Sequence, residues 1–487
     1  MTHRRAALLF LALAALAAAF RFPRLADRPM HADEGVNADK LGTLLEHGRY
    51  EYSTVDFHGP TLIYAALAFA RLGGFQNYRD LNETVLRALP AAVGVLLVAA
   101  HFWLIPYLGI WASACAALFT AVSPAMVYYS RYFIHEMLLV LLTFCALLAV
   151  LRYLRRPAAR WALAAGALFG LMFATKETWI VAAACMAVAA VVAPAVVSRQ
   201  LPKHALLAVA AFAGVALLLL SSFGTHPRGI VDSVLAYRTY FARGAGVNTA
   251  HVHPWYFYFA CLRGEALIAI LAVAGIAASH TPRFFKIYTV LMVAVYCAIP
   301  YKAPWNVLSF WHATILLAGA GVGWIATRLP KAVAIVLIGL VAAQLGTQAY
   351  ADSFERASDP RNPWVYAHTG TDVFTIVKQI AALAAVAPAG RDLPIQIFTH
   401  ENLWPLPWYL RRYPNVRWWN GVSDTAPLAQ AILATPDMEP ALVHRIYEVP
   451  PPGQREMYVP MFDRYVELRP QVEVRGYVAK SLWDALP

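Results

Sequence analysis

Charged residues are scarce in this chain, because only 14% of its 487 residues are charged while 60% are hydrophobic. Soluble domains are about a quarter charged and about half apolar. This shortage of charge excludes an ordinary soluble protein and indicates that most of the chain lies in a lipid bilayer.

A basic face with interleaved aromatic residues is also missing. The 40 Lys and Arg against 28 Asp and Glu give a net charge of +12, which by itself could suggest nucleic acid. A basic excess also arises when short cytoplasmic loops carry Lys and Arg that fix the orientation of a membrane protein. Because the basic residues gather in such loops, we expect no nucleic-acid partner.

Cysteine is rare and absent from the polar loops. All five cysteines lie in apolar stretches, and they are Cys115, Cys145, Cys185, Cys261 and Cys297. We therefore expect neither a disulfide framework nor a thiolate metal site. The His/Cys spacing of a zinc site is missing too, and no convincing internal repeat of the transporter kind is present.

Long apolar runs are what the chain has in abundance, and a span needs about 20 mainly apolar residues. The first run, 6–20, follows Arg4 and Arg5, and we interpret it as an uncleaved signal anchor. Further runs lie at 84–104, 108–128, 134–151, 161–175, 178–197, 205–222, 264–279, 287–300, 306–326 and 332–350. The sequence thus predicts an α-helical polytopic membrane protein with about 11 transmembrane helices within residues 1–350.

One apolar segment, 61–74, is short for a span at about 14 residues and follows Gly59-Pro60. We predict an interfacial or re-entrant helix there, inside a first outer loop at 21–83. Counting it as a full span would place the later basic loops outside, against the positive-inside rule.

The basic residues between the runs all fall on one side when the spans are counted in this way. Since such residues concentrate in cytoplasmic loops, we predict an inner (plasma) membrane protein with a cytoplasmic N-terminus. The residues are Arg4, Arg5, Arg152, Arg155, Arg156, Arg160, Arg199, Lys203, Arg283, Lys286, Arg328 and Lys331. The polar and acidic motifs collect on the opposite face, where ionisable residues at span ends are functional candidates.

The C-terminal part, 351–487, loses the long apolar runs and gains proline, charge and alternation. It is predicted to be a small soluble α/β domain on the periplasmic or extracellular side. Strands are expected at 394–399, 416–419 and 472–478, and helices near 372–387 and 427–434.

Asp33 and Glu34 follow the first span in a polar loop that also holds His31. A carboxylate at such a place can accept a proton from a hydroxyl, and a second acid or a metal can steady a departing phosphate. An ordinary solvated loop would have the same residue types.

Glu136, next to His135, lies at the outer end of a span, and Arg131 precedes it. Glu136 could hold a divalent cation together with Asp33, because hard cations favour oxygen ligands. An ion pair between Glu136 and Arg131 is the structural alternative.

Positive side chains on the outer face need something to offset them. Lys176, Lys302 and Arg131 could bind a phosphate or pyrophosphate, which would satisfy that need. An ion pair between Lys176 and an outer acid is the alternative. Glu177 follows Lys176 directly, and His58 lies in the first outer loop.

These motifs together resemble the glycosyltransferase-C (GT-C) superfamily of multi-span enzymes, in which an acidic pair stands in the first outer loop. More narrowly, the chain is similar to prokaryotic proteins called flippase-activity-associated, which are grouped with the dolichyl-phosphate-mannose-protein mannosyltransferase-like proteins (glycosyltransferase family 39-like). The motifs are His31 to Gly35, Phe57 to Pro60, Tyr129 to Glu136, Ala174 to Thr178, Tyr301 to Trp305, Asn362 to Thr369 and Trp404 to Arg411.

The resemblance implies a GT-C fold and an inverting transfer of a sugar from a polyprenyl-phosphate-linked donor to an acceptor glycan, lipid or protein. We expect Asp33 as the general base, with Glu34 orienting it or sharing a metal, and Arg131, Lys176 and Lys302 on the donor phosphate. The supporting residues are His31, His58, His135 and Glu177. No cofactor is required, and a divalent metal ion held by Asp33 and Glu136 is the open alternative.

Two other functions compete with this hypothesis. The chain could be a non-catalytic component that flips or transports lipid-linked sugars, in which case Asp33 would be dispensable. It could also be an envelope scaffold whose outer domain recruits partners, which would explain the C-terminal part but not the converging charged motifs.

Overall fold

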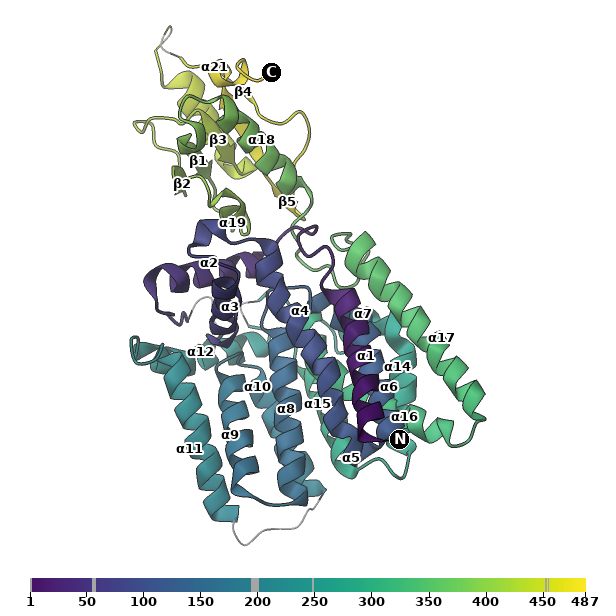
Figure 1. Ribbon diagram of the computed structural model, residues 1–487. Coiled ribbons are helices and arrows are strands. Elements are labelled where there is room, and N and C mark those ends of the chain that lie inside the picture. Colours follow the sequence, from purple (N-terminus) through teal and green to yellow (C-terminus); the bar gives the residue numbers. More distant parts are fainter. Residues whose placement is uncertain (1, 55–57, 194–200, 248, 452, 454) are drawn as a thin grey trace. The chain divides into compact units, whose positions relative to one another are not determined.

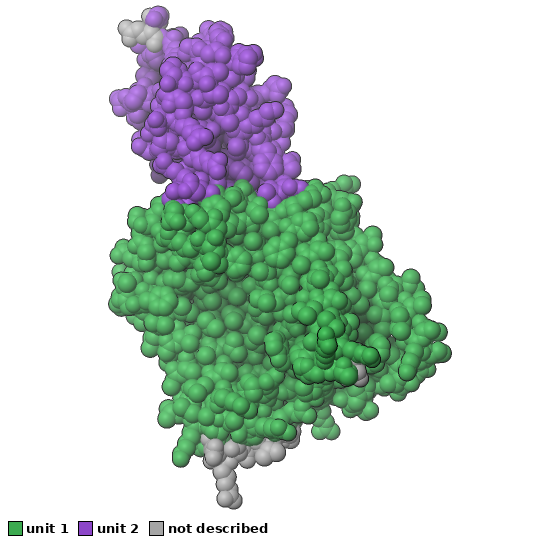
Figure 2. Space-filling view, in the orientation of Figure 1, with its two compact units in different colours: residues 1–25, 43–76, 81–366 green, residues 26–42, 77–80, 367–487 purple. Residues whose placement is uncertain are grey.

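The computed structural model describes residues 2–54, 58–193, 201–247, 249–451, 453 and 455–487 (Figure 1). Phe57 and Arg199, which belong to features singled out in the sequence, lie outside these residues. The chain divides into two compact units. Unit 1 is Met1–Leu25, Thr43–Gln76 and Leu81–Tyr366, and unit 2 is Ala26–Gly42, Asn77–Asp80 and Ala367–Pro487 (Figure 2).

Unit 1 is built of helices. They are α1 (His3–Arg21), the C-terminal part of α2 (Ala32–His47), α3 (Thr61–Leu72), α4 (Glu83–Ala100), α5 (Ile105–Leu108), α6 (Ile110–Val122), α7 (Pro124–Tyr129), α8 (Glu136–Arg155), α9 (Ala159–Phe173), α10 (Trp179–Val192), α11 (Leu201–Leu220), α12 (Arg228–Gly244), α13 (Phe257–Cys261), α14 (Ala266–Ala277), α15 (Arg283–Ala298), α16 (Val307–Ala326) and α17 (Lys331–Tyr350).

Within the described residues, seven helices are long and apolar enough to cross a membrane. They cover His3–Arg21, Glu83–Leu108, Glu136–Arg155, Leu201–Leu220, Phe257–Ala277, Pro304–Ala326 and Lys331–Glu355. Shorter apolar helices are Thr61–Leu72, Ile110–Val122, Ala159–Phe173 and Trp179–Val192. The class predicted from the apolar runs, a multi-pass helical membrane protein, is confirmed.

Two of the basic clusters lie at one end of unit 1. The ring of His3, beside Arg4 and Arg5, packs on Phe102 with 5.1 Å between centroids. The guanidinium of Arg155 donates to the carbonyl of Pro106 at 3.0 Å. The start of α1, the segment between α4 and α5, and the end of α8 therefore share one end of the helical unit, as the alternation of spans requires.

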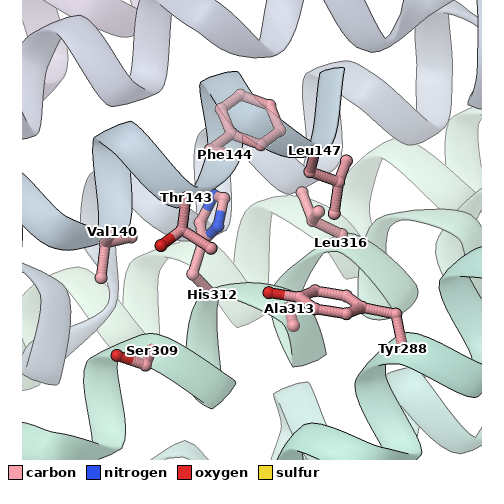
Figure 3. Close-up of a pocket in the computed structure, with 9 residues that line it drawn as sticks. All are labelled: Val140, Thr143, Phe144, Leu147, Tyr288, Ser309, His312, Ala313 and Leu316. Carbon is pink, nitrogen blue, oxygen red and sulfur yellow. The ribbon is translucent and has the colours of Figure 1, made fainter. Parts of the chain in front are cut away.

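A small, mainly apolar cavity lies between α8, α15 and α16, and side chains from all three helices point into it (Figure 3). The centre of a water molecule could move within about 10 Å³ of this cavity, which is about the space that holds one water. His312 on its wall bonds through Nε2 to Nε2 of His101 at 3.3 Å. The lining residues are Val140, Thr143, Phe144, Leu147, Tyr288, Ser309, His312, Ala313 and Leu316.

Unit 2 is an α/β unit around a five-stranded sheet of order β2-β1-β3-β7-β4. The parallel strands are β1 (Ile395–Phe398), β2 (Val416–Trp419) and β3 (Ala431–Ala434), and β7 (Arg475–Ala479) runs antiparallel to β3 and to β4 (Tyr458–Pro460). A separate hairpin pairs β5 (Glu467–Arg469) with β6 (Val472–Glu473). The helices are the N-terminal part of α2, α18 (Asp372–Val386), α19 (Leu406–Leu410), α20 (Glu439–Val443) and α21 (Lys480–Trp483).

Both faces of this sheet carry apolar side chains into a core. On one face, α18 buries Val373, Ile376, Ile380 and Leu383 at helical spacing against the strands. On the other face, Ile432 packs in a second cluster that includes residues of α20. Helix α18 and strands β1 and β2 match the predicted 372–387, 394–399 and 416–419.

Two predictions in this unit are wrong in detail. The helix expected near 427–434 is the central strand β3, and all four residues of that strand are buried. A strand buried on both faces shows no alternation, so periodicity cannot distinguish it from a short helix. The single strand expected at 472–478 is divided into β6 and β7, because the chain changes sheets at Val474.

Candidate active site

The acidic pair Asp33-Glu34 lies in the first turn of α2, and His31 closes that end of the helix. The backbone N–H of Asp33 donates to Nδ1 of His31 at 3.2 Å, and the Glu34 carboxylate accepts from the backbone N–H of His31 at 2.9 Å. This reciprocal pattern is a capping box in which histidine replaces the usual serine or threonine. The ring of His31 also packs on that of His368, with 5.0 Å between centroids.

The same cap gives the two acids different surroundings. Glu34 turns back into the protein, where its fully buried carboxylate pairs with Arg28 at 3.0 Å. Asp33 points outward with 55% of its side chain exposed, 3.8 Å from the ring of His31. The positive end of the helix dipole stabilises an anion at this position. Asp33 is therefore the acid of the pair that a substrate in solution can reach.

The C-terminal part of the chain supports this turn within unit 2. The backbone N–H of Met30 donates to the hydroxyl of Tyr409 at 2.8 Å. A Cβ at Gly35 would lie 2.9 Å from the ring of Trp404, so only glycine allows α2 to pack this closely. Residues of the Trp404 to Arg411 motif thus pack against the acidic turn and help to position it.

Glu136 and Lys176 form a buried ion pair in unit 1. Glu136 is the first residue of α8, and Lys176 follows the end of α9. Their side chains are only 6% and 5% exposed. The ion pair expected as the alternative for Lys176 is therefore present, and its acid is Glu136. The ion pair expected for Glu136 is formed with Lys176 and not with Arg131. Removal of one partner from a buried pair is costly, because the other charge is left without compensation.

Glu177 is the centre of a second buried network in unit 1. Its carboxylate accepts from Nδ1 of His58 at 2.7 Å, from the His58 backbone N–H at 3.1 Å and from the Tyr52 hydroxyl at 2.8 Å. Burial acts to raise the pKa of Glu177, but the charge and hydrogen bonds of His58, with the bond from Tyr52, lower it to about 2. Glu177 is therefore an anion at all physiological pH values and holds the His58 ring in place.

The segment that carries His58 is pressed against the end of α9. The N–H of Gly59 donates to the carbonyl of Thr175 at 3.0 Å, and the N–H of Thr61 donates to that of Ala174 at 3.1 Å. A Cβ at Gly59 would lie 2.0 Å from the Ala174 carbonyl oxygen. The backbone φ of His58 is 68°, a conformation that residues other than glycine adopt at a cost in free energy.

His135 contacts the same segment from the start of α8. Its Nε2 lies 3.2 Å from the carbonyl oxygen of Gly59, and its ring is 5.0 Å from the ring of His58. The predicted supporting residues His58, His135 and Glu177 therefore come together in space, with Glu136 next to His135 in the chain.

Lys302 is a buried cation held by backbone carbonyls. Its ammonium donates to the carbonyl of His253 at 3.2 Å and to that of Ile299, and the residue is 1% exposed. Within the described part of the chain, no carboxylate pairs with Lys302. Burial lowers the pKa of Lys302, since the charged form is poorly solvated. An anion bound beside this ammonium would stabilise it.

Arg131 is bound to the end of α1. Its guanidinium donates to the carbonyls of Arg21 at 3.0 Å, Pro23 at 2.7 Å and Arg24 at 3.1 Å, and it lies 4.2 Å from the centre of the Phe354 ring. Basic side chains commonly satisfy the last carbonyls of a helix in this way. These contacts give Arg131 a structural role in positioning the segment that leads to the acidic turn.

The predicted metal pair is divided between the units, since Asp33 belongs to unit 2 and Glu136 to unit 1. Over the residues that the structure describes, no group of three or more His, Cys, Asp or Glu side chains is arranged to hold a metal ion. A divalent ion shared by Asp33 and Glu136 stays a prediction.

A family model described as dolichyl-phosphate-mannose-protein mannosyltransferase matches residues 58–222. The match begins at His58 and contains Glu136, Lys176 and Glu177, so it includes the charged members of both buried networks of unit 1. No curated protein sequence matches the chain.

The structure is similar over nearly its whole length to ArnT from Cupriavidus metallidurans, whose crystal structure contains bound undecaprenyl phosphate. The TM-score is 0.68 with 14% sequence identity, and the match covers 98% of each chain. The fold is the GT-C fold. The oligosaccharyltransferase AglB from Archaeoglobus fulgidus, in complex with an inhibitory peptide and a dolichol-phosphate, matches with a TM-score of 0.59 and 12% identity over 88% of this chain and 69% of AglB. The resemblance to GT-C glycosyltransferases of the dolichyl-phosphate-mannose-protein mannosyltransferase kind is confirmed, whereas the narrower likeness to flippase-activity-associated proteins stays a prediction.

Sequence reasoning missed three partners of the candidate residues. Arg28 pairs with Glu34, Tyr52 binds Glu177, and Tyr237 of α12 donates to the Glu177 carbonyl oxygen at 3.4 Å. Arg28 lies within one short loop of the acids, and that proximity could have suggested it. Nothing in the spacing of Tyr52 or Tyr237 signals a contact with Glu177.

Proposed function

We propose that this chain is an integral-membrane glycosyltransferase that transfers a sugar from a polyprenyl-phosphate-linked donor to a hydroxyl-bearing acceptor at the extracytoplasmic face. The observation that carries the proposal is the exposed Asp33 carboxylate at a capped helix start in a GT-C fold. The bound undecaprenyl phosphate of ArnT and the dolichol-phosphate of AglB support a lipid-phosphate donor. The basic clusters support a cytoplasmic N-terminus in the inner membrane.

In the proposed reaction, Asp33 accepts the proton of the acceptor hydroxyl as its oxygen forms a bond to the anomeric carbon of the sugar. The bond between that carbon and the phosphate oxygen breaks, and polyprenyl phosphate leaves with the electron pair. Attack opposite the leaving group inverts the anomeric configuration. Glu34 acts through position, because its bonds to Arg28 and to the His31 backbone hold the turn that presents Asp33.

Lys302 is our first choice for the donor phosphate. Its ammonium is buried and is held in place by backbone carbonyls. A bound phosphate would supply a negatively charged partner for this ammonium. Lys176 already has Glu136 as its partner, so it contributes to a phosphate site through a shared charge. Hexosyl or mannosyl specificity is proposed from the family model alone.

The test compares Asp33→Asn with Asp39→Asn in the purified full chain, with radiolabelled polyprenyl-phosphate hexoses as donors. Asp39 is exposed on the same helix and serves as the matched control. Loss of a general base lowers the rate by about 10²- to 10⁴-fold, and we expect this for Asp33→Asn with an unchanged melting temperature. Wild-type transfer by Asp33→Asn would refute the assignment. Lipid-linked sugar movement in vesicles without any transfer would instead support a transport component.

A further inference from the structure

Helix α12 presents an apolar surface that the described residues of the protein do not cover. Val231, Val234, Leu235 and Phe241 are 58%, 60%, 57% and 61% exposed. At about 100° per residue these positions share one side of the helix. Exposed apolar stripes of this kind mark a surface that contacts something other than water.

The rest of α12 divides into two further sides. Gly229, Ser233 and Ala236 are buried against the protein. Polar and charged residues lie between the buried side and the apolar side, and they are Arg228, Asp232, Thr239 and Arg243. A helix with one side on protein, one apolar side and one polar side matches the pattern of a helix at a membrane surface.

Both ends of α12 are tied to one side of the membrane. Helix α11, a candidate span, ends at Leu220, and the next candidate span begins at Phe257. With 17 residues and four charged side chains, α12 does not cross between them. A Cβ at Gly229 would lie 2.3 Å from the Leu220 carbonyl oxygen, so the start of α12 is in close contact with the end of α11 (Figure 1).

The candidate spans on either side of α12 expose apolar or aromatic side chains as well. Val209, Leu217 and Leu218 of α11 are exposed along a span. Trp255 and Tyr256, which precede the next span, are 65% and 54% exposed, as interfacial aromatic residues usually are. Arg238 lies within the apolar stripe, and its long stem allows the guanidinium to reach lipid phosphates.

We infer that α12 lies in the outer leaflet of the bilayer, with Val231, Val234, Leu235 and Phe241 among the acyl chains and its basic residues at the phosphates. The occupant of the apolar surface is bilayer lipid. The contact with lipid follows from exposure and from the ends of the neighbouring spans, whether or not the chain transfers sugars, and the choice of the outer leaflet follows from the positive-inside orientation.

The inner side of α12 connects this lipid contact to the Glu177 network. The Tyr237 hydroxyl accepts from Nε1 of Trp179 at 2.8 Å and donates to the Glu177 carbonyl oxygen at 3.4 Å. Its ring stacks on Phe173 with 6.2 Å between centroids. The seating of α12 in lipid therefore fixes the position of one wall around Glu177.

The test places the photoreactive residue p-benzoylphenylalanine at Val234, or at Thr239 as the matched control on the polar side. The full chain is reconstituted in nanodiscs of phosphatidylcholine and phosphatidylglycerol that carry an alkyne at the end of one acyl chain. After irradiation, we expect several-fold more alkyne on the protein labelled at Val234 than on the control. The substitution Leu235→Glu should lower the labelling of the Val234 protein to the level of the control, while Thr239→Glu should leave the labelling at Val234 unchanged, because only the first places a charge in the acyl region.

Equal alkyne labelling at both positions would overturn the inference. Cross-linking of Val234 to a second copy of the chain, with no lipid labelling, would also overturn it and would assign the apolar side to a dimer. Both outcomes are read on the folded protein, since each variant is checked for a wild-type elution volume before irradiation.

Discussion

Replacement of Glu177 by glutamine tests the buried network of unit 1 most directly. The substitution keeps the size of the side chain and one acceptor oxygen but removes the charge that His58 and Tyr52 surround. In the folded protein, burial acts to raise the pKa of Glu177, but the contacts with His58 and Tyr52 outweigh it and lower the pKa from 4.5 to about 2. At about 1.4 kcal/mol per tenfold change in affinity for the proton, the ionised carboxylate contributes about 3 kcal/mol to stability at pH 7.

The sign of the pH dependence follows from the lowered pKa. The unfolded chain binds a proton at Glu177 below about pH 4.5, whereas the folded chain does so only near pH 2. The stabilisation is therefore complete above pH 4.5 and is lost as the pH falls toward 2. At pH 3.5 about 2 kcal/mol remains. The wild-type protein should approach the stability of Glu177→Gln as the solution becomes more acidic.

The assay is equilibrium unfolding in mixed micelles at pH 7, 4.5 and 3.5, with both proteins in the same detergent. Glu51→Gln is the control, because Glu51 is half exposed and its ion pair with Arg49 should contribute little. A difference between wild type and Glu177→Gln that stays below about 1 kcal/mol at pH 7, or that grows on acidification, would contradict the reasoning.

Three further substitutions test other parts of the structure. Gly59→Ala should destabilise the protein by about 3 kcal/mol in the same unfolding assay, because the new Cβ would meet the Ala174 carbonyl. The control Gly214→Ala, in the open middle of α11, should be neutral or stabilising. Leu316→Ala should cost about 2 kcal/mol or more by enlarging the cavity in Figure 3, and an unchanged unfolding midpoint would show that the helices close around it. Lys302→Met should lower kcat/KM for a polyprenyl-phosphate donor by about 10- to 100-fold, and equal kinetics would remove Lys302 from the phosphate site.

The helical part of the fold could be predicted because a bilayer imposes a length on apolar segments. The runs at 134–151 and 306–326 became α8 and α16 with bounds that differ by a few residues. The short run at 61–74 became α3, a helix of 12 residues. In these segments, the need to keep apolar side chains away from water produces the sequence pattern and also favours a membrane-spanning helix.

The pairing of charged residues could not be predicted in the same way. Glu136 and Lys176 are separated by 40 positions, and His58 and Glu177 by 119. Residue type showed that each side chain needs a partner at a span end, but the choice of partner depends on how helices pack. The β3 segment failed for a related reason, since its identity as a strand rests on pairing with β1 and β7.

At the proposed base, the capping box of α2 depends both on the local sequence and on tertiary packing. Asp33 and Glu34 are neighbours in the chain and carry the same charge, yet one is exposed and the other is fully buried. The difference arises because the third position of a helix can reach back to the N-cap, whereas the second cannot. Glu34 therefore uses its charge to build the turn, and Arg28 neutralises it. Asp33 is left at the positive end of the helix with a solvated carboxylate, where an acceptor hydroxyl can meet it.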